Sequence, residues 1–281
     1  MTATAERQAT PQRALEPPPP VRVLRALIRR GLRDRRKAPL TWGISIGALC
    51  AFEVAIWPSI ENSIGKAVEN YPKGLKEAFG IADLNTVEAY LEAEMFSLIL
   101  PLAIAFFAVR CVADVLSAAE EQHHLDTLLS APVPRRVLVT AAFGVSAVMV
   151  AAVLAVVGTL TWVVGGLVGA GVSAGALAGG LLAVWSLAIL FAGLATAGAG
   201  FLHRSALVTA LAMGTAVAMY VIDLVGKLAD GAEFLRWASA FKYYDSPLRD
   251  GVDLLACAGL LAVGLACAAV GAVLFERRDV L

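Results

Sequence analysis

Six long runs of apolar residues, separated by shorter polar segments, dominate the sequence. A helix needs about 20 mostly apolar residues to cross a bilayer, and each run is about that long. The predicted spans run from about 40 to 58, 95 to 116, 137 to 168, 174 to 201, 206 to 225 and 252 to 275. The pattern therefore predicts an all-α integral membrane protein, with about six transmembrane helices within residues 39–276.

Composition excludes an ordinary soluble domain. Hydrophobic residues make up 59% of the chain and charged residues 16%, whereas soluble domains average about 45–50% and about 25%. The four cysteines all lie inside apolar runs without metal-ligand spacing, so we expect small buried residues and no metal site. Residues 1–20 are polar and end in four prolines, and we expect this N-terminal segment to be disordered.

Lysine and arginine are distributed unevenly, which predicts the orientation. Ten of them precede the first span, and the short connections on the same side carry Arg135, Arg136, Arg204, Arg277 and Arg278. On the other side, basic residues are diluted among acids in two longer external segments, 60–94 and 226–250. Cytoplasmic loops are the basic ones. Both termini, including residues 277–281, are therefore predicted to be cytoplasmic, in a multi-pass protein of the cytoplasmic (inner) cell membrane.

Residues 21–38 form a basic amphipathic pattern before the first span. Apolar and basic residues each recur at helical spacing on separate faces. The residues that define these faces are Leu24, Ile28, Leu32, Arg22, Arg25, Arg29 and Arg33. The pattern predicts an interfacial helix. It could serve only as a topology anchor on the lipid surface, or could also contact a cytoplasmic partner.

The loop at 117–136, between the second and third spans, is too short to cross a membrane and too apolar for an idle connection. Leu125, Leu128 and Leu129 share one face of a short amphipathic helix, which Pro132 and Pro134 would end. Some other surface must cover these leucines.

The same loop resembles a known signature. Glu120 and Glu121, followed by Asp126-Thr-Leu-Leu-Ser-Ala-Pro-Val-Pro-Arg-Arg136, are similar to the acidic pair and Leu-Leu-Ser-x-Pro-x-x-Arg motif of type-2 ABC transporter permeases. His124 departs from the pattern, which commonly has glycine there. The aromatic stretch at 240–244 and the basic end at 275–279 are weaker similarities, and the resemblance covers residues 21–281.

This resemblance implies a permease subunit of an ABC exporter that moves a hydrophobic or amphiphilic, drug- or lipid-like substrate outward. A second permease chain would complete the pathway. Separate ATP-binding cassette subunits, which hold ATP and Mg²⁺, would grip the loop as a coupling helix. The implied docking residues are Glu120, Glu121, His124, Leu125, Asp126, Leu128, Leu129, Pro132, Arg135 and Arg136. The chain has no phosphate-binding loop of its own, so we expect no cofactor, no catalytic residue and no nucleic-acid partner.

Three ionisable residues within the predicted spans are candidates for the translocation path. Arg110 and Asp114 are four residues apart on one helix face, so they could form a structural ion pair or a gate. Glu53 has no obvious partner at its depth, and could be a ligand for substrate or lie in a solvated outer vestibule.

An intramembrane metalloprotease and a secondary transporter are the two alternative function classes. An intramembrane metalloprotease would use the metal-binding residue types Glu120, Glu121, His123, His124 and His203. The sequence has no His-Glu-x-x-His motif, however, and Leu125 stands where the related Glu-Glu-x-x-x-Arg pattern needs arginine. A secondary transporter would carry several buried ionisable groups, and the pattern offers only the three residues above.

Overall fold

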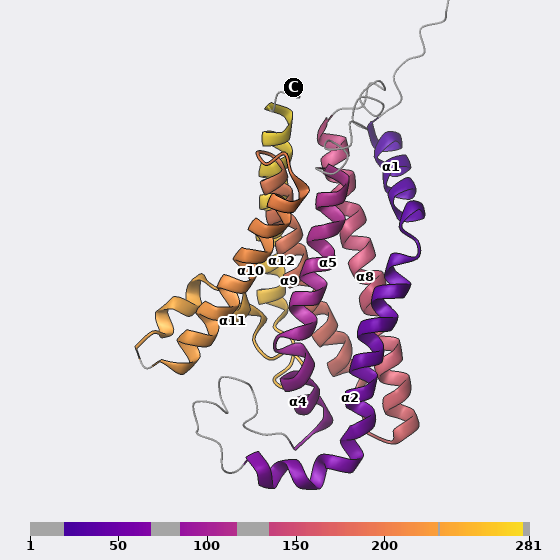
Figure 1. Cartoon of the computed structure of the whole chain (residues 1–281), viewed down its shortest axis with the longest axis vertical. Helices are drawn as coiled ribbons and strands as arrows, with labels where there is room; N and C mark the ends of the chain where they lie inside the picture. The colour runs from indigo at the N-terminus through magenta and orange to yellow at the C-terminus, as the bar shows by residue number, and fades with distance from the viewer. Residues whose placement is uncertain (1–19, 69–84, 117–134, 230, 278–281) are drawn as a thin grey trace, which may run out of the picture.

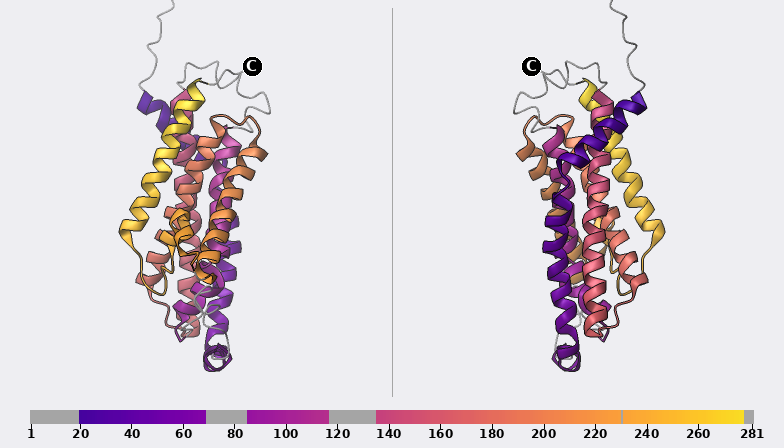
Figure 2. Two further views of the ribbon diagram at one scale, coloured as in Figure 1. Left: turned by 90° about the vertical axis from the view of Figure 1, so that its left-hand side faces the viewer. Right: turned by 90° about the vertical axis from the view of Figure 1, so that its right-hand side faces the viewer.

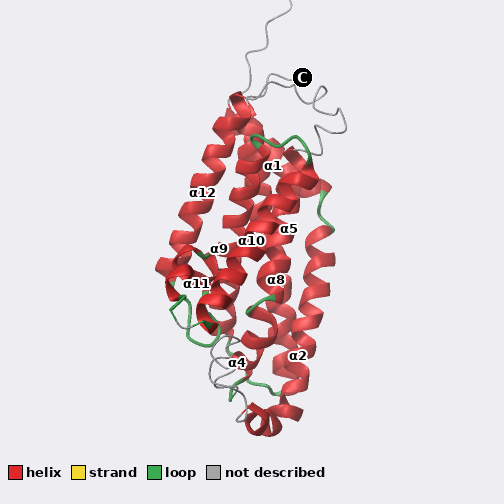
Figure 3. Cartoon of the chain, turned by 60° about the vertical axis from the view of Figure 1, so that its left-hand side comes forward, coloured by secondary structure: helices red, strands yellow, loops and turns green. Residues whose placement is uncertain are grey.

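A computed structural model of the chain describes residues 20–68, 85–116, 135–229 and 231–277. Within these ranges all regular structure is helical (Figure 3). Six helices are long and apolar enough to cross a membrane: α2 (Ala38–Val68), α5 (Ile99–Leu116), α8 (Arg135–Val168), α9 (Ala174–Ala199), α10 (Ser205–Leu228) and α12 (Leu254–Arg277). Each coincides with one predicted span, so the all-α fold with six candidate spans is confirmed.

Helix α9 forms the centre of the bundle and contacts α5, α8, α10 and α12 (Figure 1). Its most apolar stretch is 67% buried, against 22% for α10 and for α12. The closest approach joins α9 to α12. A Cβ atom on Gly193 would lie 2.1 Å from the carbonyl oxygen of Gly264, so only glycine lets the two backbones meet at this depth.

The helix predicted over residues 21–38 is α1 (Pro20–Asp34). It packs across the end of α8, where Ile28 faces Gly144 and Gly31 faces Val145 (Figure 2). Its arginines at 22, 25, 29 and 33 are exposed, whereas Leu24, Ile28 and Leu32 are half-buried. The two predicted faces therefore exist, and the apolar face rests at least partly on protein.

The start of α1 and the end of α12 lie at the same end of the bundle (Figure 1). The end of α5 and the start of α8, which flank residues 117–134, lie there too. The turn after α1 is tied to α5, because Arg35 Nη1 donates a hydrogen bond to the Cys111 carbonyl oxygen at 2.8 Å. This end of the bundle thus gathers the elements that we predicted to be cytoplasmic.

Short helices occupy the two segments between spans that we predicted to be external. They are α4 (Val87–Leu91), which continues into a π-helix at Glu92–Phe96, the 3₁₀ helix η2 (Glu233–Ala238) and α11 (Ala240–Tyr244). The first candidate span, Ala38–Glu61, ends close to the predicted end near Pro58, and helix α2 continues past it to Val68. Proline lacks only one backbone donor, and the helix bends away beyond the bundle rather than stopping (Figure 1).

Candidate functional site

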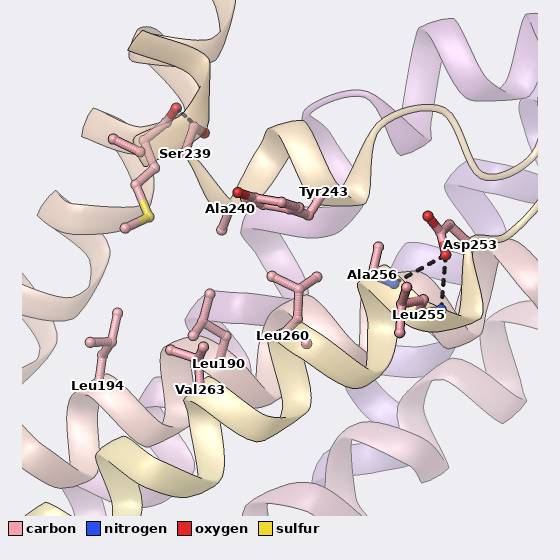
Figure 4. Close-up of a pocket in the computed structure, with 13 residues that line it drawn as sticks. Leu190, Leu194, Ser239, Ala240, Tyr243, Asp253, Leu255, Ala256, Leu260 and Val263 are labelled. Carbon is pink, nitrogen blue, oxygen red and sulfur yellow. Dashed lines mark hydrogen bonds between the residues drawn. The ribbon is translucent and has the colours of Figure 1, made fainter. Parts of the chain in front are cut away.

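An apolar cavity lies between α9, α10, α11 and the first half of α12 (Figure 4). Its volume is about 560 Å³. The walls are mainly aliphatic, from Leu190, Leu194, Met219, Leu260 and Val263. Ser239, Tyr243 and Asp253 are the lining residues with polar side chains. A concave apolar space with a few polar groups is the usual form of a small-molecule site.

One wall of the cavity is held in place by an ion cluster around a buried carboxylate. Asp223 on α10 is 3% exposed. Its carboxylate accepts a hydrogen bond from Arg236 Nε at 2.9 Å and lies 2.8 Å from Lys227 Nζ. Beside this cluster, the Ser239 hydroxyl donates to the Met219 carbonyl oxygen at 2.6 Å. These contacts fix η2 and the start of α11 against α10, so the wall does not depend on apolar packing alone.

Asp253 lies at the edge of the cavity and caps α12. Its Oδ1 atom accepts hydrogen bonds from the backbone N–H groups of Leu255 at 2.8 Å and Ala256 at 3.1 Å (Figure 4). Aspartate is among the best N-cap residues because it satisfies N–H groups that have no partner inside the helix. The same geometry fixes the position of a carboxylate next to the apolar wall.

The segment 87–96 links three other parts of the fold through its polar side chains. Glu88 accepts a hydrogen bond from the backbone N–H of Ser173, in the turn before α9, at 2.9 Å. The Tyr90 hydroxyl donates to Glu53 Oε2 on α2 at 2.7 Å. Glu92 Oε2 accepts from the Leu248 backbone N–H, in the loop before α12, at 2.8 Å. Three spans are therefore joined through one short segment.

Glu92 is the most unusual of these residues. It is 2% exposed, it lies in the π-helix, and its Oε1 atom has no hydrogen-bond partner among the residues that the structure describes. Burial raises the pKa of this carboxyl to about 8, although the Leu248 N–H and the charge of Arg249 oppose the shift. Glu92 is therefore largely protonated at neutral pH. The sequence analysis missed it, since its partner is 156 residues away.

The three predicted path residues are placed as follows. Arg110 Nη2 lies 2.5 Å from Asp114 Oδ1, so the spacing-based ion pair forms. Glu53 is not isolated, and the view that it lacks a partner at its depth is wrong, because Tyr90 reaches it from a segment 37 residues along the chain. These contacts do not bring the three residues into the apolar cavity. Their role in translocation stays a prediction.

Most of the predicted docking residues, from Glu120 to Pro132, lie outside the described residues. Arg135 and Arg136 begin α8, and Arg136 forms an ion pair with Glu276 at the end of α12. His123 and His124 of the metalloprotease hypothesis are likewise outside the described ranges. Within those ranges, no three His, Cys, Asp or Glu side chains come close enough to hold a metal ion.

Comparison with known families bears on most of the chain. Residues 30–276 match the family described as the C-terminal domain of the multidrug efflux system permease Rv1217c. No match was found among curated proteins.

Proposed function

The chain belongs to the family of the multidrug efflux system permease Rv1217c, and we propose that it is the membrane half of an ATP-driven ABC exporter. Its substrates would be hydrophobic or amphiphilic compounds, in keeping with the family description. The observation that carries the proposal is the family match over residues 30–276, which includes all six candidate spans almost completely. ATP and Mg²⁺ belong to a separate cassette ATPase in this proposal.

We propose that the ATPase docks at the end of the bundle where the start of α1 and the end of α12 lie. The end of α5 and the start of α8, which flank residues 117–134 in the sequence, lie at this end, together with α1 and the end of α12. The ion pair of Arg136 with Glu276 connects the base of α8 to α12, and Arg35 connects the base of α2 to α5. A movement that the ATPase imposes on the ends of α5 and α8 would therefore be transmitted to α2 and α12 through direct contacts. We accordingly place both termini and the ATPase in the cytoplasm.

A second permease chain completes the proposed assembly. The most apolar stretches of α10 and α12 are each only 22% buried within one chain, which leaves wide helix faces for lipid or for a second copy. Six helices offer little room for a sealed pathway with two access states. We therefore propose two permease chains and two ATPases per transporter.

The docking proposal is tested by replacing the leucines of the loop. Leu128→Ser combined with Leu129→Ser should release the ATPase from the purified complex, because each buried leucine contributes about 1.5–3 kcal/mol before the costs of association. Glu120→Gln with Glu121→Gln serves as the matched control. It should keep the complex, because exposed charges contribute little affinity, and should lower substrate-stimulated ATP hydrolysis.

Size-exclusion profiles and thermal unfolding of the permease alone will show whether the leucine variant remains folded. A folded variant that still co-purifies with its ATPase and transports normally would mean that the loop is not the docking element.

An ion-coupled secondary transporter is the second candidate. The candidates named from the sequence did not include Glu92 and Asp223, which are both buried. Asp223 is neutralised by two cations, whereas Glu92 has an unpaired oxygen and could exchange a proton. Reconstitution without an ATPase separates this candidate from the exporter.

A further inference from the structure

We propose that the cavity between α9, α10, α11 and α12 binds a lipophilic organic cation, with its apolar body against the aliphatic walls and its charge at Asp253. This inference rests on the proposed efflux function and gives it a substrate class.

The shape of the cavity favours a compact apolar body. Its volume of about 560 Å³ lies within the range of about 300–1,000 Å³ that small-molecule sites occupy. Ten of the thirteen lining residues have apolar side chains or none, and the aliphatic ones come from three different spans (Figure 4). Leu255 and Val263 are exposed on α12, so the cavity opens to the outside of the bundle. A ligand can therefore reach it from the bilayer.

The charge of the site favours a cation. Asp253 is the single charged residue among those that line the cavity. Its Oδ1 atom receives both capping hydrogen bonds, which leaves Oδ2 for a ligand. Asp253 takes part in none of the ion pairs found among the described residues. Asp253 is exposed at the edge of the cavity, so its charge contributes a modest attraction for a cation at the mouth of the apolar space.

Two basic side chains between η2 and α12 are engaged elsewhere. Lys242 Nζ lies 2.9 Å from the centre of the Trp237 ring, and Arg249 pairs with Asp250 at 2.6 Å. Tyr243 also lines the cavity, and the face of an aromatic ring is a favourable neighbour for an organic cation. Carboxylate, aromatic ring and aliphatic walls together match a charged head on an apolar body better than a neutral or anionic molecule.

A glycine that lines the cavity allows a steric test of the proposal. Gly259 on α12 lines it, and a Cβ atom at this position would meet nothing within 4 Å. Gly259→Leu therefore fills the space without a clash at the helix. Gly214 on α10 offers a matched control, since its Cβ would also meet nothing within 4 Å and it does not line the cavity.

The charge test uses Asp253→Asn. Asparagine caps a helix about as well as aspartate does, so the variant removes the charge and keeps α12 intact. Asp245→Asn is the control, because it removes a charge from the same loop without touching the cavity.

Binding is measured on the full chain in lipid nanodiscs, with empty nanodiscs subtracted. The probes are tetraphenylphosphonium and tetraphenylborate, which share a shape and differ in charge. We expect the wild-type chain to bind the cation in preference to the anion. Asp253→Asn should weaken cation binding by about fivefold and abolish the preference, and Gly259→Leu should weaken it by roughly tenfold or more. Both control variants should bind as the wild type does.

Equal binding of the two probes by the wild-type chain, or unchanged cation binding by Gly259→Leu, would overturn the inference. Either result leaves the exporter proposal intact if the loop leucines still govern ATPase docking. A chain that binds the cation as expected but never associates with an ATPase would instead reject the exporter and keep the site.

Discussion

The protonation of Glu92 has a direct consequence for stability. In the folded chain burial holds the pKa of this carboxyl at about 8, against an ordinary value of 4.5. Between these two pH values the folded state keeps a proton that the unfolded state has released. The free energy of unfolding therefore falls by about 1.4 kcal/mol for each pH unit in this window. The contribution is fully present below the unfolded pKa and is lost as the pH rises through the folded pKa.

Glu92→Gln should remove this pH dependence. Glutamine keeps an acceptor for the Leu248 N–H and mimics the neutral acid. From pH 6 to pH 8 the wild-type chain should lose on the order of 2–3 kcal/mol that the variant retains. The assay is the apparent unfolding temperature of the permease in nanodiscs, measured for both proteins at half-unit steps from pH 5.5 to pH 9. The difference between the two curves isolates Glu92 from the other carboxyl groups.

Glu92→Ala is the control at the same position. It has no side-chain acceptor, so the buried Leu248 N–H loses its partner at a cost of about 1–3 kcal/mol. Its unfolding temperature should lie below that of Glu92→Gln at every pH. Parallel curves for the wild type and Glu92→Gln across this range would show that Glu92 is ionised in the fold, and the reasoning from burial would be refuted.

Two further tests concern the packing and the ion cluster. Gly193→Ala would place a Cβ against the Gly264 backbone and should destabilise the bundle by about 1–3 kcal/mol, whereas Gly214→Ala should leave the unfolding temperature unchanged or slightly higher; equal behaviour of the two variants would contradict the close α9–α12 contact. Asp223→Ala should cost about 1–3 kcal/mol, because it leaves the half-buried Arg236 and Lys227 without their carboxylate, and unfolding scans would refute this if the loss were negligible.

The spans were predictable because each depends on local composition alone. A run of about 20 apolar residues is most stable in the hydrocarbon core of a bilayer. The predicted runs end close to the ends of the observed helices. The face pattern of α1 was predictable for the same reason, since Ile28 and Leu32 follow helical spacing. What covers that face was not, because the packing against α8 depends on Gly144 and Val145, more than a hundred residues away.

The polar contacts were mostly hidden from the sequence. Glu92 stands in an acid-rich stretch before a span, which gives no sign that the Leu248 backbone will bury it. Glu53 looked isolated because Tyr90 reaches it from another segment. Asp223 and Lys227 do carry a local signal, being four residues apart, but the participation of Arg236 follows only from the fold of η2 against α10.

The most direct test of the exporter account is transport by purified components in liposomes. The permease is reconstituted alone and with its cassette ATPase, and the movement of tetraphenylphosphonium is followed with either ATP or an imposed proton gradient. The account predicts ATP-dependent transport by the complex and none by the permease alone under a proton gradient. Gradient-driven transport by the permease alone, abolished by Glu92→Gln, would contradict it and establish a secondary transporter.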